Sequence, residues 1–305
     1  MAISTVKAKI NGVEYNLTLN QSTGKYEATI TAPSKSSYNQ TGHYYDVEVT
    51  ATDTAGNSST INASDAALGN SLKLKVKETV APTIAVTSPS SGATITNNSP
   101  AITVQLRDND SGINISTFSM TINGGSAITS TSNGVSAKQV QGGYDVTYTP
   151  PTALTDGKQT VVVNVKDNDG NAAPALTSTF TVDTTPPVLD VTEPANNMET
   201  NSRTVKVKGI TNDATSSPVT VSITVNGTTT TKPTVNSNGT FEATVTCSNE
   251  GVNTIVITAT DSAGKSTSIT RTVNVDTDAP EFVNVSIAPN PVNTGGTYVI
   301  SVTVE

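Results

Sequence analysis

Apolar and polar residues alternate along short stretches of this chain, and turn residues separate the stretches. The alternation has a period of two in VEVTATD, ending at Asp53, in VVVNVKD, ending at Asp167, and in IVITATD, ending at Asp261. A period of two places successive side chains on opposite faces of a β-strand. The pattern therefore predicts antiparallel sheets that pack on a core with one face and meet water with the other.

The pattern recurs three times with the same landmarks. Each copy has an Asn-Gly pair after an apolar strand, an aromatic residue opening an alternating strand, and a strand that ends in Asp with Gly three residues later. The landmarks are Asn11-Gly12, Tyr26, Asp53 and Gly56, then Asn123-Gly124, Tyr144, Asp167 and Gly170, then Asn226-Gly227, Phe241, Asp261 and Gly264. Asn-Gly accepts the positive φ of a tight hairpin turn. We expect Tyr26, Tyr144 and Phe241 to be equivalent core positions.

About a hundred residues and seven short strands per copy are typical of an immunoglobulin-like sandwich. We therefore predict an all-β fold of tandem immunoglobulin-like β-sandwiches arranged as a rod. The expected segments are an incomplete or atypical first repeat, two whole repeats, and a two-strand segment that resembles the start of a further one. Their boundaries are 1–79, 80–183, 184–277 and 278–305.

The first copy starts at a different phase from the other two. About forty residues, enough for two strands, lie between Pro82 and Asn123 and between Pro187 and Asn226, whereas ten residues precede Asn11. Residues 280–305 encode such a pair of strands around a turn. The apolar side chains expected to mediate assembly are Phe282, Val283, Val285, Ile287, Val299, Ile300, Val302 and Val304.

One hypothesis is that this ribbon completes the first repeat of another molecule, so that copies associate head to tail. Two other interpretations stay open. The first repeat can be a smaller self-sufficient sandwich, patched by the strand-like run 71–78, or the chain can be a piece of a longer array.

The composition is typical of a protein built from β-strands, and it limits the classes of partner that we expect. Hydrophobic residues make up 34% of the chain and charged residues 14%, and there is no Trp. Lys and Arg number 17 against 25 Asp and Glu, a net charge of −8 that disfavours a nucleic-acid partner. No stretch reaches the roughly 20 apolar residues of a membrane span. The first residues contain no apolar core of a secretory leader, so we expect no Sec signal and no membrane insertion.

Catalytic residue types are scarce. The single His43 and the single Cys247 belong to different repeats, and a nucleophilic pair needs hydrogen-bond contact. One cysteine also excludes a disulfide within the chain. We expect no enzymatic activity and no cofactor. The aromatic group Tyr38, Tyr44 and Tyr45 is the one candidate platform for a ligand such as a sugar, although at least one such ring is expected to pack in the core.

The quoted pattern, with its D-x-A-G-N corner and the closing V-D-T-x-x-P, resembles the bacterial Ig-like tandem repeats of phage virion proteins and surface adhesins. The resemblance covers nearly the whole chain. It implies a structural protein, and the lack of a visible leader favours a virion tail, fibre or decoration component assembled in the bacterial cytoplasm. Other virion or surface structural proteins would then be its partners. The alternative is a cell-surface or extracellular adhesin, or a glycan-binding module, with a host glycan as ligand. A third, remote alternative is an accessory unit of a glycoside hydrolase.

Adhesins with similar repeats bind Ca²⁺ at the linkers between repeats. The resemblance therefore implies metal candidates in the linker aspartates Asp183, Asp276 and Asp278, joined by Asp108, Asp110 or Asp213 from a neighbouring loop. Glu78 occupies the matching place in the first linker. DNDSG and DNDGN begin like an EF-hand loop, but their twelfth positions, Ser119 and Ser178, exclude that motif. Turn-holding bonds from Asp and Asn side chains to the backbone are the simpler explanation, so calcium is possible but not the favoured expectation.

Overall fold

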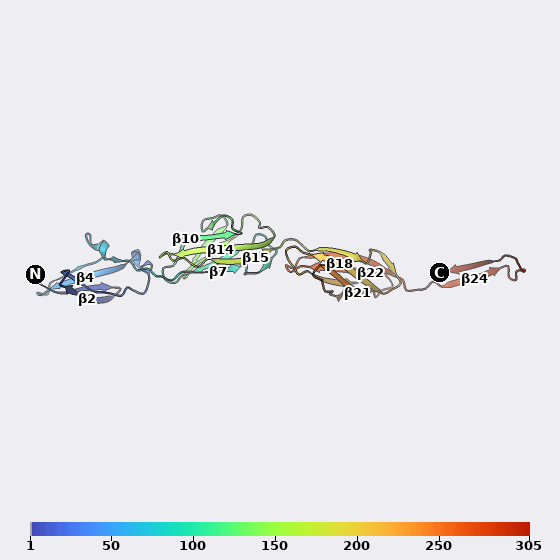
Figure 1. The fold of residues 1–305 in the computed structure, drawn as a ribbon, viewed down its shortest axis with the longest axis horizontal. Helices are drawn as coiled ribbons and strands as arrows, with labels where there is room; N and C mark the ends of the chain where they lie inside the picture. The colour runs from blue at the N-terminus through green and yellow to red at the C-terminus, as the bar shows by residue number, and fades with distance from the viewer. Residues whose placement is uncertain (1) are drawn as a thin grey trace. The chain divides into compact units, whose positions relative to one another are not determined.

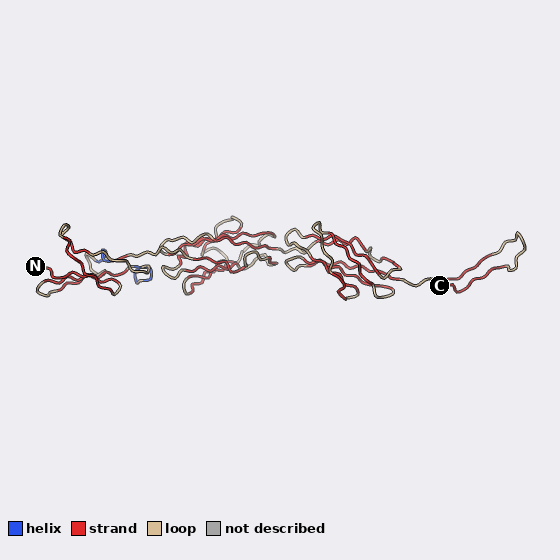
Figure 2. Tube along the Cα trace, turned by 60° about the horizontal axis from the view of Figure 1, so that its bottom comes forward, coloured by secondary structure: helices blue, strands red, loops and turns tan. Residues whose placement is uncertain are grey.

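The computed structural model describes residues 2–305, and almost all of its regular structure is strand (Figure 1). The chain divides into two compact units, and the boundary along the chain lies between Asp183 and Thr184. The two units are described separately below. The only helical segments in the part of the chain that is described are short 3₁₀ turns in the first repeat (Figure 2). They are η1 (Ser37–Asn39), η2 (Thr41–His43) and η3 (Gly69–Leu72).

The second repeat is a complete two-sheet sandwich. One sheet has the order β11-β10-β14-β15-β8 and the other β12-β13-β9-β7. Its strands are β7 (Thr83–Ser88), β8 (Thr94–Ile95), β9 (Ile102–Arg107), β10 (Ile113–Ile122), β11 (Ile128–Thr129), β12 (Val135–Val140), β13 (Gly143–Tyr148), β14 (Gly157–Asp167) and β15 (Leu176–Val182).

The third repeat has the same plan, with sheets β16-β18-β21 and β17-β23-β22-β19-β20. In both repeats the first long strand pairs with the second, and the second pairs with the strand that the aromatic landmark opens. The strands are β16 (Val188–Glu193), β17 (Met198–Thr200), β18 (Thr204–Asn212), β19 (Thr220–Val225), β20 (Thr228–Thr231), β21 (Thr240–Thr246), β22 (Gly251–Thr260) and β23 (Ser266–Val275).

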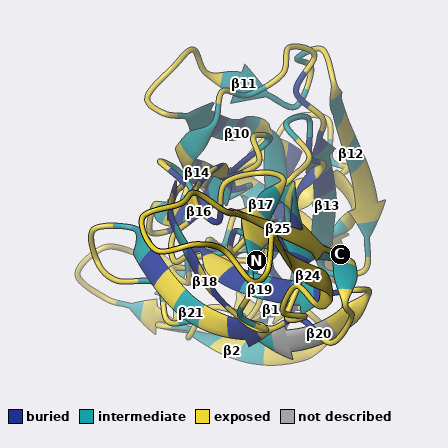
Figure 3. Ribbon diagram, turned by 90° about the vertical axis from the view of Figure 1, so that its right-hand side faces the viewer, coloured by how far each residue is buried: buried dark blue, intermediate teal, exposed yellow. Residues whose placement is uncertain are grey.

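Each whole repeat encloses its own apolar core, formed by alternate residues of the facing sheets. In the third repeat Phe241 is 2% exposed and belongs to this core, as its sequence position predicts. Tyr144 packs against the core of the second repeat and is partly buried. Buried and exposed residues alternate along β21, which Figure 3 shows as blue and yellow bands. The predicted all-β, immunoglobulin-like sandwich fold is confirmed for these repeats.

The first repeat is built around one main sheet with the strand order β3-β2-β1-β4-β5, and β6 pairs with the start of β4. The strands are β1 (Ile3–Ile10), β2 (Val13–Asn20), β3 (Lys25–Glu27), β4 (Tyr45–Asp53), β5 (Ser58–Ile61) and β6 (Lys73–Leu74). The strand expected after Gly24 ends at Glu27 and pairs with β2, because no second sheet is present in residues 2–79 to receive its continuation. Tyr26 is consequently half-buried rather than enclosed.

Two strands form the last regular structure of the second unit. β24 (Phe282–Ala288) and β25 (Val299–Val304) pair antiparallel with each other as a separate two-stranded sheet. We call this pair the tail hairpin. Every one of its residues is exposed (Figure 3).

The predicted turn chemistry is confirmed at the shared landmarks. Asn11, Asn123 and Asn226 have φ values of 50°, 52° and 51°, and a glycine with positive φ follows each of them. In the first and third repeats the pair forms a two-residue hairpin turn, with Ile10 opposite Val13 and Val225 opposite Thr228. Asn-Gly is favoured there because both central residues of such a turn need positive φ.

Candidate functional site at the junction of the first two repeats

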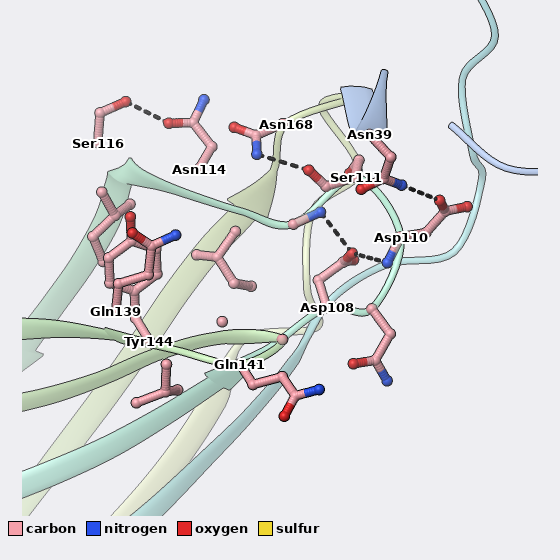
Figure 4. Close-up of a pocket in the computed structure, with 17 residues that line it drawn as sticks. Asn39, Asp108, Asp110, Ser111, Asn114, Ser116, Gln139, Gln141, Tyr144 and Asn168 are labelled. Carbon is pink, nitrogen blue, oxygen red and sulfur yellow. Dashed lines mark hydrogen bonds between the residues drawn. The ribbon is translucent and has the colours of Figure 1, made fainter. Parts of the chain in front are cut away.

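Loops from the first and second repeats meet at Asp110. Its Oδ1 accepts a hydrogen bond from the backbone N–H of Ser36 at 3.0 Å. It also accepts one from Nδ2 of Asn39 at 2.8 Å, which Figure 4 shows. Ser36 and Asn39 flank and end the η1 turn of the first repeat, whereas Asp110 lies in the loop after β9. Hydrogen bonds to a charged acceptor are stronger than neutral ones, so this carboxylate ties the two repeats together.

The linker between these repeats is fixed through Glu78. Its Oε1 accepts from the backbone N–H of Ser111 at 2.6 Å, and its own N–H donates to Oδ2 of Asp169 at 3.0 Å. Nδ2 of Asn171 donates to the Glu78 carbonyl at 3.1 Å. One linker residue therefore bonds to two separate loops of the second repeat, which fixes where the chain enters that sandwich.

Three carboxylates converge at this junction. Ligand oxygens of Glu78, Asp108 and Asp167 all lie within 4.8 Å of one another. Asp108 and Asp167 are buried and Glu78 is half-buried. Like charges this close, withdrawn from water, raise the free energy of the folded state unless a cation or a proton offsets them.

Local turn geometry explains why two of these carboxylates point inward. Asp108 follows β9, and its Oδ1 accepts the backbone N–H groups of Asp110 and Gly112, both at 2.9 Å. Asp167 ends β14, and its Oδ1 accepts the N–H of Asn171 at 2.8 Å. The predicted turn-holding bonds are thus confirmed. The turn bonds of Asp108 engage only Oδ1, so turn-holding and metal binding do not exclude each other there. Asp167 uses both oxygens, because its Oδ2 also accepts from Nδ2 of Asn171 at 2.7 Å.

The donor set at the junction fits the calcium ion that the family resemblance implies. All the converging side chains offer oxygen, and Ca²⁺ takes six to eight oxygen ligands. The buried Ser111 hydroxyl, on the residue whose N–H binds Glu78, has no hydrogen-bond partner among the described residues. A bound ion would be held by Glu78, Asp108 and Asp167. The sequence pointed to the other linkers, because Glu78 replaces the usual aspartate here.

The predicted linker residues Asp276 and Asp278 lie together in the second unit. Their carboxylates group with Glu250 within 4.8 Å, and all three residues are exposed. Glu250 also forms an ion pair with Arg203, and the backbone N–H of Thr277 donates to it. That backbone hydrogen bond is the main cause that lowers the pKa of Glu250. Arg203 already offsets part of this charge, and no sequence pattern singled out Glu250.

The other two predicted linker and loop aspartates occupy separate units. Asp183 follows β15 in the first unit, and its backbone N–H donates to the carbonyl of Ile95 at 2.9 Å. Asp213 follows β18 in the second unit, and its Oδ1 accepts from the N–H groups of Thr215 and Ser216, each at 2.7 Å. Within its own unit, Asp213 holds a turn.

The three candidate tyrosines have different environments. Tyr45 is buried in the first repeat, and its hydroxyl donates to the carbonyl of Lys35 at 3.1 Å, so its ring is no platform for a ligand. Tyr38 is exposed and stacks on His43, with ring centroids 4.1 Å apart. Lys73 Nζ lies 5.3 Å from the centroid of the Tyr44 ring, a cation–π distance.

A polar hollow of about 610 Å³ lies beside the junction (Figure 4). Amide and carboxylate side chains dominate its lining, together with one tyrosine. These side chains include Asn39, Asn109, Asp110, Asn114, Gln139, Gln141, Tyr144 and Asn168. Sequence reasoning overlooked this hollow because its residues come from four separate segments of the chain that no short motif connects.

The candidate nucleophile Cys247 and the candidate base His43 lie in different repeats, each in its own local environment. Cys247 is fully buried in the core of the third repeat, and desolvation raises the pKa of its thiol. A buried thiol with a raised pKa is a poor nucleophile. His43 is exposed in η2, where Nδ1 lies 2.9 Å from the carbonyl oxygen of Tyr38.

Comparisons with known proteins found one family model and several solved structures that match parts of the chain. The family model for glucodextranase, domain B, matches residues 187–277, which is the third repeat. No curated protein matches the chain. In the structure as described, no helix has the length and apolarity needed to cross a membrane.

Three solved structures that match the chain are distant from it in sequence. The Clostridium thermocellum CbhA fibronectin(III)-like modules are 15% identical, with 64% of this chain and 94% of that one covered and a TM-score of 0.37. Rst D1-D2 is 13% identical, with 65% and 100% covered and a TM-score of 0.39. Sidekick-1 immunoglobulin domains 1–5 are 13% identical, with 99% and 60% covered and a TM-score of 0.38.

Proposed function

We propose that this chain is a non-enzymatic structural component of a phage or prophage virion, in a tail, fibre or decoration, that associates head to tail with its own copies. The observation that carries the proposal is the pair of complete sandwiches in the second and third repeats, each with a closed apolar core and one shared strand plan. The likeness of the repeat landmarks to virion Ig-like repeats supports the assignment to a particle.

The hydrogen bonds at the junction would allow a structural protein to transmit force from one repeat to the next. Asp110 and Glu78 bond the first repeat and its linker to loops of the second, so a load on one repeat passes to the next through hydrogen bonds as well as through the backbone. Calcium, when bound, would neutralise the carboxylates that converge there. Glu78, Asp108 and Asp167 would then draw the linker and two loops to one point.

Immunogold electron microscopy tests the virion assignment. An antibody raised against residues 80–183 is applied to purified particles and to cells of the bacterium that carries the gene. Gold along tails, fibres or capsids is the expected result. Gold on cell surfaces with bare particles would contradict the virion assignment and favour the adhesin.

The polar hollow beside the junction supports a second candidate, a glycan-binding adhesin. Sugar sites combine amide and carboxylate hydrogen-bonding groups with an aromatic ring, and the hollow offers Asn109, Gln141 and Tyr144. Titration calorimetry against bacterial surface polysaccharides, with N109A/Q141A as the variant and the outward-facing Thr147→Ala as the control, tests it. Binding that the double variant abolishes and the control retains supports an adhesin, and no binding excludes it for those glycans.

A further inference from the structure

The sheet of the first repeat has an apolar face that its own repeat covers only in part. Cross-strand partners place Val6 beside Ala51, and Ala8 between Tyr15 and Val49, all on one face. Lys7, Lys9, Glu14 and Glu48 lie on the other face, which is polar.

Equivalent positions in the whole repeats show how much burial the sheet of the first repeat lacks. Val49 lies four residues before the corner aspartate of its repeat, as do Val163 and Ile257 in theirs. Val163 and Ile257 are fully buried, whereas Val49 is half-buried. In the second and third repeats this face is covered by the second sheet, and the described part of the first repeat contains no such sheet.

The tail hairpin has an apolar face that no sheet covers among the described residues. Its register places Phe282 opposite Val304, Val285 opposite Val302, and Ile287 opposite Ile300. Directly opposed residues share a face, so these six side chains form one apolar face. Their exposed fractions run from 46% at Ile287 to 70% at Phe282. Val299 lies opposite Ala288, among serines and threonines on the other face.

The whole repeats show how such a hairpin packs on such a sheet. β7 pairs with β9 as β24 pairs with β25, and β9 also pairs with β13. The alternating residues Ile102, Val104 and Leu106 of β9 are at most 1% exposed in the core. Ile300, Val302 and Val304 repeat that alternation in β25.

The first repeat also has an open position for the backbone of a further strand. β13 corresponds to the segment that starts at Tyr26, and its backbone pairs with β9. In the first repeat only Lys25–Glu27 forms a strand, and residues 28–34 lie outside any strand. Edge backbone groups are a template for strand addition.

We infer that the tail hairpin of one copy packs its apolar face on the apolar face of the first repeat's sheet in a second copy, with β25 beside residues 26–30. The contact joins two different surfaces, so it is heterologous and produces open chains of molecules unless the rotation between copies closes a ring. This inference rests on the structural role proposed above and names its partner as the same protein.

The test is the concentration dependence of molar mass, measured by light scattering during size-exclusion chromatography of the full chain. The wild-type protein should grow from 31.3 kDa to multiples of that mass as concentration rises. Ile300→Lys buries an unpaired charge and should weaken association at least about 100-fold. Ser301→Lys, one residue along on the polar face, is the matched control and should associate like the wild type.

A mixing experiment identifies the second surface. Val6→Lys on the apolar face of β1 should also stop growth, with Thr5→Lys on its polar face as control. A mixture of the Ile300→Lys and Val6→Lys chains keeps one intact tail and one intact head, so it should form a one-to-one complex that neither variant forms alone.

A wild-type chain that stays at 31.3 kDa up to millimolar concentration would overturn the inference. So would Ile300→Lys association equal to that of Ser301→Lys. If Val6→Lys fails to fold, the tail variants still decide the outcome. A monomeric chain whose antibody nonetheless labels particles would refute self-association and leave the virion role standing, so the two proposals fail separately.

Discussion

The third repeat and the first repeat use the same strand landmarks but bury them very differently. In the third, Ile255, Ile257 and Ala259 of β22 are fully buried between two sheets. In the first, their counterparts Val47, Val49 and Ala51 of β4 are half-buried on a single main sheet. The difference teaches that the corner and the hairpin turn form from local sequence, whereas core burial depends on a second sheet that faces the first.

The largest expected effect is a loss of stability when the closed apolar core of the third repeat is disrupted. Phe241→Ala should cost about 3–5 kcal/mol in the free energy of unfolding of the third repeat, because it removes a buried aromatic ring and leaves a cavity. Tyr26→Ala, at the matching position of the first repeat, should cost less than about 1 kcal/mol in dilute solution. Scanning calorimetry checks both, with Thr244→Ala on the exposed face of β21 as control. Equal costs at the two positions would contradict the contrast between a closed and an open repeat.

Calcium should act on the junction with a smaller effect. At a free concentration about 100 times the Kd, a bound ion adds about 2.7 kcal/mol to the free energy of unfolding. If the junction binds calcium, chelation by EDTA should therefore lower the free energy of unfolding of the wild-type protein, as calorimetry measures.

The double variant E78Q/D108N should respond to EDTA less than the wild type does. Asp190→Asn, an exposed carboxylate of β16, serves as the control and should keep the full response. A wild-type melting profile unaffected by EDTA would show that Glu78 and Asp108 only hold the junction by hydrogen bonds.

The smallest expected effect is a pH dependence at the corner of the first repeat. The Asn57 side chain, followed by its backbone N–H, lowers the pKa of Asp53. A lowered folded-state pKa contributes stability above the ordinary aspartate pKa near 4, and this stability is lost as pH falls through the folded value. Asn57→Ala should move the Asp53 pKa back toward its ordinary value, as NMR titration of the carboxyl carbon measures. An unchanged titration would show that the Asn57 side chain is not the main cause.

The alternating strands and their turns could be predicted from the sequence because they depend on neighbours in the chain. Period-two patterns located β4, β14 and β22, and Asn-Gly located the turns at Asn11, Asn123 and Asn226. Short strands such as β8 and β17 could not be found, since two or three residues carry no periodicity. The strand begun at Lys25 is shorter than predicted because it pairs only with β2, and no second sheet is present in residues 2–79 to pair with its continuation.

The candidate site was only partly visible in the sequence. Asp108 and Asp167 stood in recurring turn motifs, but their convergence with Glu78 depends on where the linker enters the second repeat. The resemblance directed attention to Asp276 and Asp278, whose group also contains Glu250 from a turn with no motif. Residues that meet across repeats leave no spacing signal, so structure was needed to find them.

Amide hydrogen exchange of the full chain at low and high protein concentration tests the central claim most directly. The account predicts that β24, β25 and residues 26–30 exchange quickly when dilute and become protected together when concentrated. β14 and β22 should be protected at both concentrations, because their sandwiches are closed within one chain. Rapid exchange of β24 and β25 at every concentration, or protection independent of concentration, would contradict the claim that a second copy completes the first repeat.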